Sequence, residues 1–161
     1  MVAAARYNAV FQLARLTDRT LGHLLDCLTE IDTEQLELNQ SLPLLYESGV
    51  RYYHDKRDDP WMDVLSILAA HARWQATGVP QVIDCEDLAC WRAAELRVRF
   101  GIFARPVFER VRVQTPDGVK QYVHILVQYP DGRTEDPSRR LGMTTPGEFS
   151  LSQALADMMK R

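Results

Sequence analysis

The sequence lacks several features that would assign a protein to a broad class at once. No apolar run is long enough to cross a membrane, so we expect no membrane-spanning segment. Its 3 cysteines are an odd number without metal-site spacing, which fits a reducing compartment better than a disulfide framework. Positive charge is not in excess either: 19 Lys and Arg against 22 Asp and Glu give a net charge of -3, so nothing favours nucleic acid as a partner.

An N-terminal targeting signal and internal repeats are also missing. The first residues do not combine a basic region, an apolar segment and a small-residue cleavage site, so no signal peptide is expected. What remains is an ordinary globular composition, with 46% hydrophobic and 25% charged residues in a chain of 161. A chain of this length most simply forms one domain, and a cytoplasmic location is expected.

The first half of the chain is mainly helical in pattern. Apolar residues in 21–31 recur at helical spacing, and Asp32 followed by Gln35 resembles a capping box that would begin a separate short helix. A further helix is expected from Pro60 to about Gly78, with its apolar face at Val64, Leu65, Leu68 and Ala72.

Three shorter segments complete the expected elements. Residues 6–16 alternate loosely and suggest a strand, with a helix as the alternative, and 50–53 suggest a short strand. The tail is expected to end in a helix over 151–159.

The stretch 82–107 organises the chain. Asp84 is a suitable N-cap, and apolar residues then recur at helical spacing to form one face: Ala89, Ala93, Leu96 and Phe100. Gly101 is a natural end for this helix, and 102–107 is typical of the start of a strand. Cys85 therefore falls in the first turn of a helix.

This position has a chemical consequence for the Cys85 thiol. The unpaired N–H groups and the positive end of the helix dipole stabilise a thiolate, and the same N–H groups can hold an oxyanion. Glu86 and its acidic neighbours push the thiol pKa the other way. Activation of Cys85 as a nucleophile therefore requires a nearby imidazole.

The second half of the chain predicts a three-stranded antiparallel meander. Two Pro-Asp-Gly turns, at 116–118 and 130–132, separate apolar runs of period two. His124 lies on the middle strand, and Asp136 ends the third.

The register of this meander decides whether His124 and Asp136 meet. If Tyr129 pairs with Arg133 across the second turn, the two residues are diagonal neighbours on adjacent strands. If the Cys85 helix packs on the face that carries His124, thiol, imidazole and carboxylate line up as nucleophile, base and orienting group.

These motifs together resemble the core of the transglutaminase-like superfamily. The run at 84–89 resembles its nucleophile helix, although Ile83 replaces a common glycine. Gly-Ile-Phe-Ala-Arg at 101–105 resembles its Gly-Ile-Pro-Ala-Arg segment, with Phe in place of Pro. His-Ile-Leu at 124–126 resembles the family's His-Ala-Trp strand, and Asp-Pro-Ser at 136–138 its Asp-Pro-Thr. The resemblance covers roughly 51–143 and implies a papain-like α+β fold, with the nucleophile helix packed on an antiparallel sheet.

One branch of this superfamily comprises bacterial cysteine proteases that cut biofilm adhesins. The run from Trp61 to Asp-Cys-Glu-Asp resembles it and implies calcium at Asp84, Glu86 and Asp87. Helix capping, with salt bridges to Arg92 or to Arg139 and Arg140, is the alternative use of these acids. No other cofactor is expected.

A second branch comprises small transglutaminase-like proteins encoded near phage or phage-tail-like structural genes. The pattern at 44–50, 91–96 and 135–138 resembles it. This likeness implies particle proteins as partners and a virion-associated location as the alternative to the cytoplasm.

The expected oxyanion donors are the Cys85 backbone N–H and one side chain upstream of it. Gln81, Trp61 and Tyr53 can each donate a hydrogen bond, and the sequence does not choose among them. The remaining cysteines and tryptophans are expected to pack in the core: Cys27, Cys90, Trp74 and Trp91.

The sequence thus predicts a single α+β domain with an N-terminal extension at 1–49, a catalytic core at 50–143 and a C-terminal helix at 144–161. Cys85 would attack an amide carbonyl of a protein or peptide, with His124 as base and Asp136 as orienting group. Hydrolysis by water is the default. The alternatives are a true transglutaminase with an amine acceptor and a catalytically silent component of a phage-like particle.

Overall fold

A computed structural model describes residues 17–54, 60–115 and 118–144. In chain order its elements are α1 (Asp18–Leu38), η1 (Leu45–Glu47), α2 (Val64–Thr77), α3 (Cys85–Phe100), β1 (Arg105–Thr115), β2 (Gly118–Gln128), β3 (Thr134–Glu135) and α4 (Pro137–Arg140). The predicted α+β class is therefore confirmed. The strand expected at 6–16 and the helix expected at 151–159 lie outside the described residues.

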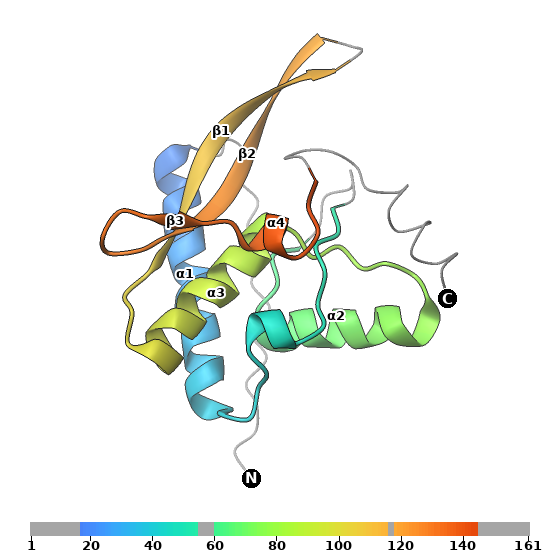
Figure 1. Cartoon of the computed structure of the whole chain (residues 1–161), viewed down its shortest axis with the longest axis vertical. Helices are drawn as coiled ribbons and strands as arrows, with labels where there is room; N and C mark the ends of the chain where they lie inside the picture. The colour runs from blue at the N-terminus through green and yellow to red at the C-terminus, as the bar shows by residue number, and fades with distance from the viewer. Residues whose placement is uncertain (1–16, 55–59, 116–117, 145–161) are drawn as a thin grey trace.

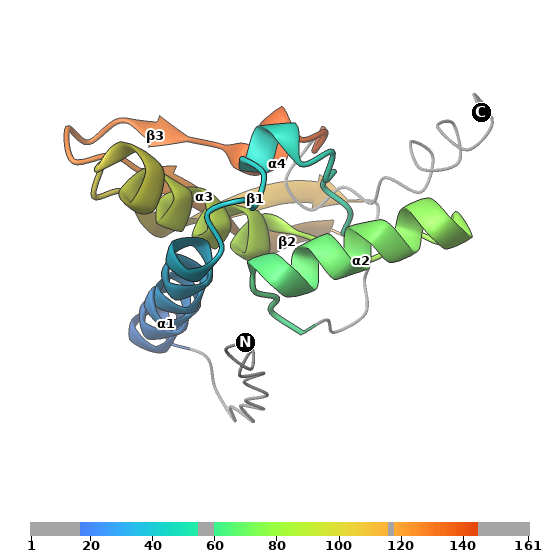
Figure 2. The ribbon, with the colours of Figure 1, turned by 90° about the horizontal axis from the view of Figure 1, so that it is seen from below.

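Helix α3 lies at the centre of the molecule. It contacts α1, α2, α4, η1 and both long strands, and α1 lies on one side of it while the β3–α4 segment lies on the other (Figures 1 and 2). Its bounds agree with the prediction, since it begins at Cys85 after the N-cap Asp84 and ends at Gly101, whose φ of 65° is the left-handed conformation that glycine favours.

The three strands form one antiparallel sheet in the order β1-β2-β3, as predicted. β2 pairs with β1 along its whole length and with β3 over two residue pairs, Val127 with Glu135 and Gln128 with Thr134. The N–H of Tyr129 donates to the carbonyl of Arg133 at 2.8 Å, so the expected turn register is correct. The start of β1 and the end of β2 lie against the helices, and the end of β1 and the start of β2 extend away from them (Figure 1).

The core consists of two apolar clusters that share α3. Leu88, Trp91 and Ala94 face a cluster with α2, the η1 region and Leu141. Ala89, Ala93 and Leu96 face a second cluster with α1 and the sheet residues Ile125 and Val127. Because one helix supplies buried residues to both, nearly its whole circumference is covered, which is typical of a central helix.

Several details differ from the sequence-based expectation. Phe100, expected on the apolar face of α3, is 52% exposed, and β1 begins at Arg105 rather than at 102. In α2 the buried residues are Val64 and Ile67, whereas Leu65 and Ala72 are exposed. Cys27 was expected in the core but is exposed, because it lies on the outer side of α1.

The expected break at Asp32 is also absent, since α1 runs continuously to Leu38. Residues 50–53 contribute an isolated bridge between Tyr53 and Ile83 rather than a full strand. Within the described residues, no helix combines the length and apolar character that a membrane crossing requires.

Candidate functional site

The start of α3 is held in place by backbone hydrogen bonds to acidic side chains. Asp87 accepts from the N–H of Asp84 at 3.4 Å and from the N–H of Met62 at 2.7 Å. Tyr53 and Ile83 exchange backbone hydrogen bonds on the other side of the helix start. Cys85 is therefore fixed in the first helical turn, where the backbone N–H groups have no carbonyl partner within the helix.

His124 and Asp136 meet as the register predicts. His124 is only 2% exposed, and its Nε2 lies 2.9 Å from Oδ2 of Asp136. Asp136 is also the N-cap of α4, and it accepts from the backbone N–H of Arg139 at 3.0 Å. With Nε2–H donated to the carboxylate, the free lone pair of the imidazole is on Nδ1, the atom that can act as base.

The environment of Asp136 keeps it ionised. Burial by itself would raise the pKa of this carboxyl group, but the hydrogen bonds from His124 and from the Arg139 backbone outweigh burial and lower the pKa below its usual value. The charged side chain of Arg139, 3.3 Å away, acts in the same direction. Asp136 can therefore orient the imidazole and stabilise its protonated form.

The Cys85 thiol lies against β2 at the backbone of Ile125. The backbone N–H of Ile125, the residue after His124, donates toward the sulfur, and the thiol donates to Oε2 of Glu86 at 3.4 Å. Among the described residues these are the polar partners of the sulfur, so the thiol proton is directed to Glu86 and not to the imidazole. The structure thus assembles the His124–Asp136 pair and places the thiol beside the strand that carries it.

Electrostatics at the thiol oppose ionisation in this arrangement. Burial, followed by the charges of Glu86 and Asp84, raises the pKa of Cys85 well above its usual value, and the Ile125 N–H only partly offsets them. Burial and the proximity of Asp84 also raise the pKa of Glu86. The acidic neighbours therefore act on the thiol in the direction that the sequence indicated.

The acidic side chains bring together part of the calcium set expected from the sequence. Asp84, Cys85 and Glu86 place one ligand atom each within 4.8 Å of one another. Asp87 is not among them, because its two oxygens accept the backbone N–H groups described above. Calcium takes 6–8 oxygen ligands, and this cluster offers two carboxylates beside a thiol. Asp84 and Asp87 instead serve to fix the start of α3, and Asp84 also pairs with His54 at 3.2 Å.

Tyr52 is a residue of this site that sequence reasoning missed. Its side chain is 9% exposed, and burial together with the charges of Cys85, Asp84, Glu86 and Asp136 raises the pKa of its hydroxyl. Because the charges of both Cys85 and Asp136 act on it, the hydroxyl lies within electrostatic range of both groups. It has no hydrogen-bond partner within residues 17–54, 60–115 and 118–144, so it is available as a donor.

Two of the three side chains predicted as oxyanion donors are engaged in other contacts. The amide of Gln81 donates to the carbonyls of Val79 and Pro80 in its own loop. Tyr53 faces Trp74, with ring centroids 6.2 Å apart. Trp61 packs on the cluster that also contacts Cys85. The alternation of residues 50–53 could not indicate whether Tyr52 or Tyr53 faces the thiol. The side on which each ring lies is fixed by the backbone bridge between Tyr53 and Ile83.

Comparison with protein-family models, with curated proteins and with solved structures finds no match to this chain.

Proposed function

We propose that this protein is a thiol-dependent acyl-transfer enzyme of the transglutaminase-like, papain-like type, which cleaves an amide bond of a protein or peptide. The observation that carries the proposal is the buried His124–Asp136 pair at 2.9 Å, on the strand whose Ile125 N–H meets the Cys85 sulfur. A nucleophile, a base and an orienting carboxylate in this order are the elements of covalent acyl transfer.

The chemistry assigned to each residue follows from its free atoms. His124 Nδ1 takes the thiol proton as the sulfur bonds to the carbonyl carbon. The imidazolium then protonates the leaving amine, the C–N bond breaks and a thioester with Cys85 remains. Water, deprotonated by the same imidazole, attacks the thioester and releases the acid and the thiol. Asp136 stabilises the imidazolium in both halves.

Two donors are assigned to the oxyanion. The Cys85 backbone N–H opens the helix and is supported by the helix dipole. The second is the hydroxyl of Tyr52, in place of Gln81, Trp61 or Tyr53. Its support is the burial of Tyr52, the effect of both the Cys85 and Asp136 charges on its hydroxyl, and the lack of a hydrogen-bond partner for that hydroxyl in the described part of the chain.

A catalytically silent component of a phage-like particle is the second candidate. The observation that favours it is the hydrogen bond from the thiol to Glu86, together with the raised pKa of Cys85. A resting thiol that donates to a carboxylate is not itself a nucleophile. The reactivity of Cys85 toward an alkylating reagent separates the two candidates.

The test is alkylation by iodoacetamide at pH 7, followed by peptide mapping. Cys27 is exposed and serves as an internal reference, whereas Cys85 is partly buried. With its raised pKa, Cys85 can react faster than Cys27 only if His124 removes its proton. We expect that result in the wild type, a sharp loss of Cys85 reactivity in His124→Ala, and a smaller loss in Asp136→Asn.

Cys85→Ala should abolish amide cleavage by orders of magnitude while the fold is retained, because the nucleophile is irreplaceable and the thiol contributes little apolar area. If Cys85 and Cys27 react at equal rates and His124→Ala leaves the rate of Cys85 unchanged, the enzyme proposal is wrong. The catalytically silent component would then be the better interpretation.

A further inference from the structure

Glu135, the residue before Asp136, is the centre of a hydrogen-bonded network. Its carboxylate accepts from the hydroxyls of Tyr46 and Tyr129 and, through both oxygens, from Nε of Arg92 at 3.2 and 3.3 Å. Burial alone would raise the pKa of Glu135, but these donors outweigh it and lower the pKa. Glu135 is therefore ionised, and its acceptor positions are occupied.

Two exposed arginines on either side of this network stack on tyrosine rings. The guanidinium of Arg140 lies 3.7 Å from the ring centroid of Tyr46, and that of Arg133 lies 5.2 Å from the centroid of Tyr129. Stacking on an aromatic ring holds a flexible side chain in one orientation, so less entropy is lost when it binds a ligand.

Within the described part of the chain, the hydrogen-bonding capacity of both arginines is largely unused. Arg140 Nη1 lies 3.7 Å from Glu135, which is too long for a hydrogen bond. Arg133 donates through Nε to Asp131, an exposed pair that water and salt screen strongly. Each side chain keeps terminal N–H groups for an incoming acceptor.

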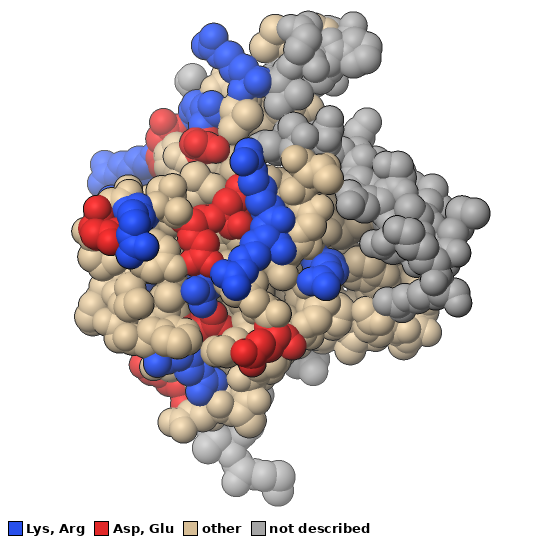
Figure 3. Space-filling model, viewed as in Figure 1, with Lys and Arg blue, Asp and Glu red and all other residues tan. Residues whose placement is uncertain are grey.

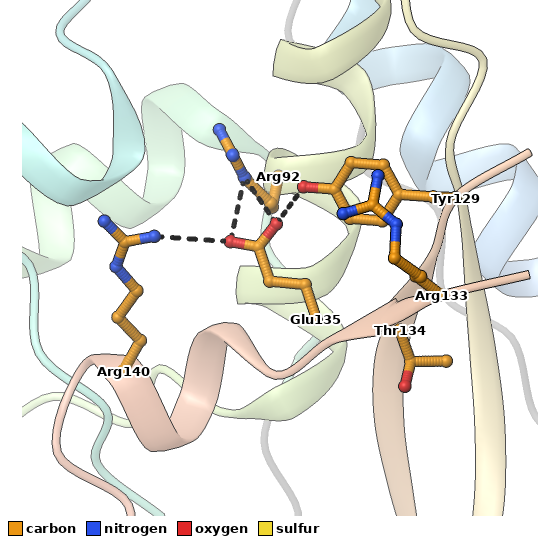
Figure 4. Close-up of a pocket in the computed structure, with 6 residues that line it drawn as sticks. All are labelled: Arg92, Tyr129, Arg133, Thr134, Glu135 and Arg140. Atoms are coloured by element: carbon orange, nitrogen blue, oxygen red, sulfur yellow. Dashed lines mark hydrogen bonds and ion pairs between the residues drawn. The ribbon is translucent and has the colours of Figure 1, made fainter. Parts of the chain in front are cut away.

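These side chains line a pocket of about 420 Å³ (Figure 4). Its lining comprises Arg92, Arg133 and Arg140 as cations, Glu135 as the anion, and Tyr129 and Thr134. Arg92 neutralises the charge of Glu135, so no carboxylate among the lining residues lacks a partner. The guanidiniums of Arg133 and Arg140 face the opening of the pocket. On the surface, a run of Lys and Arg side chains crosses the region where β3 leads into α4, with acidic atoms beside it (Figure 3).

We propose that this pocket binds an oxyanion, a carboxylate or a phosphate, carried by the peptide substrate. Guanidinium groups present paired N–H donors that match the oxygens of both groups. The pocket adjoins the active site through the chain itself, because Glu135 precedes Asp136 and α4 connects Asp136 to Arg140. A substrate with an acidic group near the scissile bond would contact both. The substrate role rests on the proposed function, whereas anion binding does not.

The first arm of the test measures binding without catalysis. The full chain is titrated with succinate and, separately, with inorganic phosphate at constant ionic strength, with chloride as reference, while the arginine Nε–H signals are followed by NMR. We expect shifts at Arg140 and Arg133, and at least about tenfold weaker binding in Arg140→Gln and in Arg133→Gln, as for loss of a charge-assisted hydrogen bond. Arg73→Gln, an exposed arginine on α2, is the matched control and should bind as the wild type does.

The second arm uses peptide electrophiles that label Cys85, in pairs that differ only by Glu or Gln at one position. At one peptide position, the Glu peptide should label Cys85 faster than the Gln peptide does. The ratio of the two labelling rates should fall to about one in Arg140→Gln but persist in Arg73→Gln. The stronger of succinate and phosphate in the first arm identifies the group.

The proposal that this pocket binds an anion would be wrong if neither anion binds saturably, or if Arg140→Gln binds as well as the wild type. This holds even if Cys85 is labelled. Anion binding that needs Arg140, with no labelling of Cys85 by any probe, would support the pocket and refute the enzyme.

Discussion

The acidic residues around Cys85 have different partners, and this difference decides which of them accepts the thiol proton. Asp87 accepts backbone N–H groups and Asp84 pairs with His54, so both are tied to the framework of the helix start. Glu86 is the one that accepts from the thiol. Its side chain therefore competes with His124 for the thiol proton.

Replacement of Glu86 by Gln should make Cys85 more reactive. When Glu86 ionises, its negative charge opposes the thiolate, so removing that charge lowers the thiol pKa. We expect the pH profile of Cys85 alkylation to move toward lower pH. Rates are measured with iodoacetamide from pH 6 to 10, and Glu47→Gln, on the exposed side of η1, is the control. A profile that stays in place would show that Glu86 does not restrain the thiol.

Tyr52→Phe tests the assignment of the second oxyanion donor. Loss of one such donor costs about 100- to 1,000-fold in kcat with little change in KM, because the contact forms only in the transition state. Alkylation of Cys85 by iodoacetamide has no oxyanion and should continue. Tyr53→Phe is the matched control, since its ring lies against Trp74. An equal loss in both variants would indicate general damage to segment 50–53 and not a donor role for Tyr52.

At the scale of elements, the predicted capping pair in α1 has the expected chemistry but acts on a different helix. Oδ1 of Asp32 accepts from the N–H of Val64 at 3.0 Å, and Gln35 accepts from the N–H of Leu65 at 3.1 Å. Both donors belong to the first turn of α2, whose own N-cap Asp63 supplies a third acceptor, to Ser66. Two side chains from the middle of α1 thus satisfy N–H groups that α2 cannot bond internally.

Asp32→Asn should stabilise the protein at neutral pH. Burial raises the pKa of Asp32 well above its usual value, so the unfolded chain loses this proton at lower pH than the folded one. The free energy of unfolding of the wild type therefore falls as pH rises above about 3.9, through the folded pKa. The side-chain amide introduced by the substitution would keep an acceptor for the N–H of Val64 without that ionisation.

We expect a gain in the free energy of unfolding at pH 7 and a smaller gain at pH 4. Urea unfolding at both pH values measures it, with Asp26→Asn on the exposed side of α1 as control. A loss of stability that is equal at both pH values would mean that Asp32 is not held protonated.

The same elements explain what could be predicted from the sequence. Local signals identified α3, the meander and the His124–Asp136 register correctly, because caps, Pro-Asp-Gly turns and strand alternation depend on neighbouring residues. The partners of Asp32 and Glu135 and the place of Tyr52 near the site could not be predicted, because each depends on a segment distant in the chain. Tyr46 and Glu135 are 89 positions apart, and no local pattern indicates such a contact.

At the scale of the whole molecule, α3 joins the site to both halves of the core. Its first turn carries Cys85, and its remaining turns supply buried residues to the α2 cluster and to the α1–sheet cluster. α1 also contributes to both, through Leu36 in one and Leu25 in the other. With two helices shared, neither cluster can lose its packing without exposing the other, so the described core should unfold cooperatively.

Leu25→Ala and Ile67→Ala test this unity, because each residue is almost fully buried in a different cluster, at 1% and 0% exposure. Each substitution should lower the free energy of unfolding by about 2–5 kcal/mol. In each variant, far-UV circular dichroism and tryptophan fluorescence should still follow one coincident transition. Trp91 reports the α2 cluster, and Trp61 packs against the other. If Leu25→Ala separated the two probes while Ile67→Ala did not, α1 and the sheet would form an independent unit. The position of the Cys85 thiol beside β2 would then depend on docking between two units.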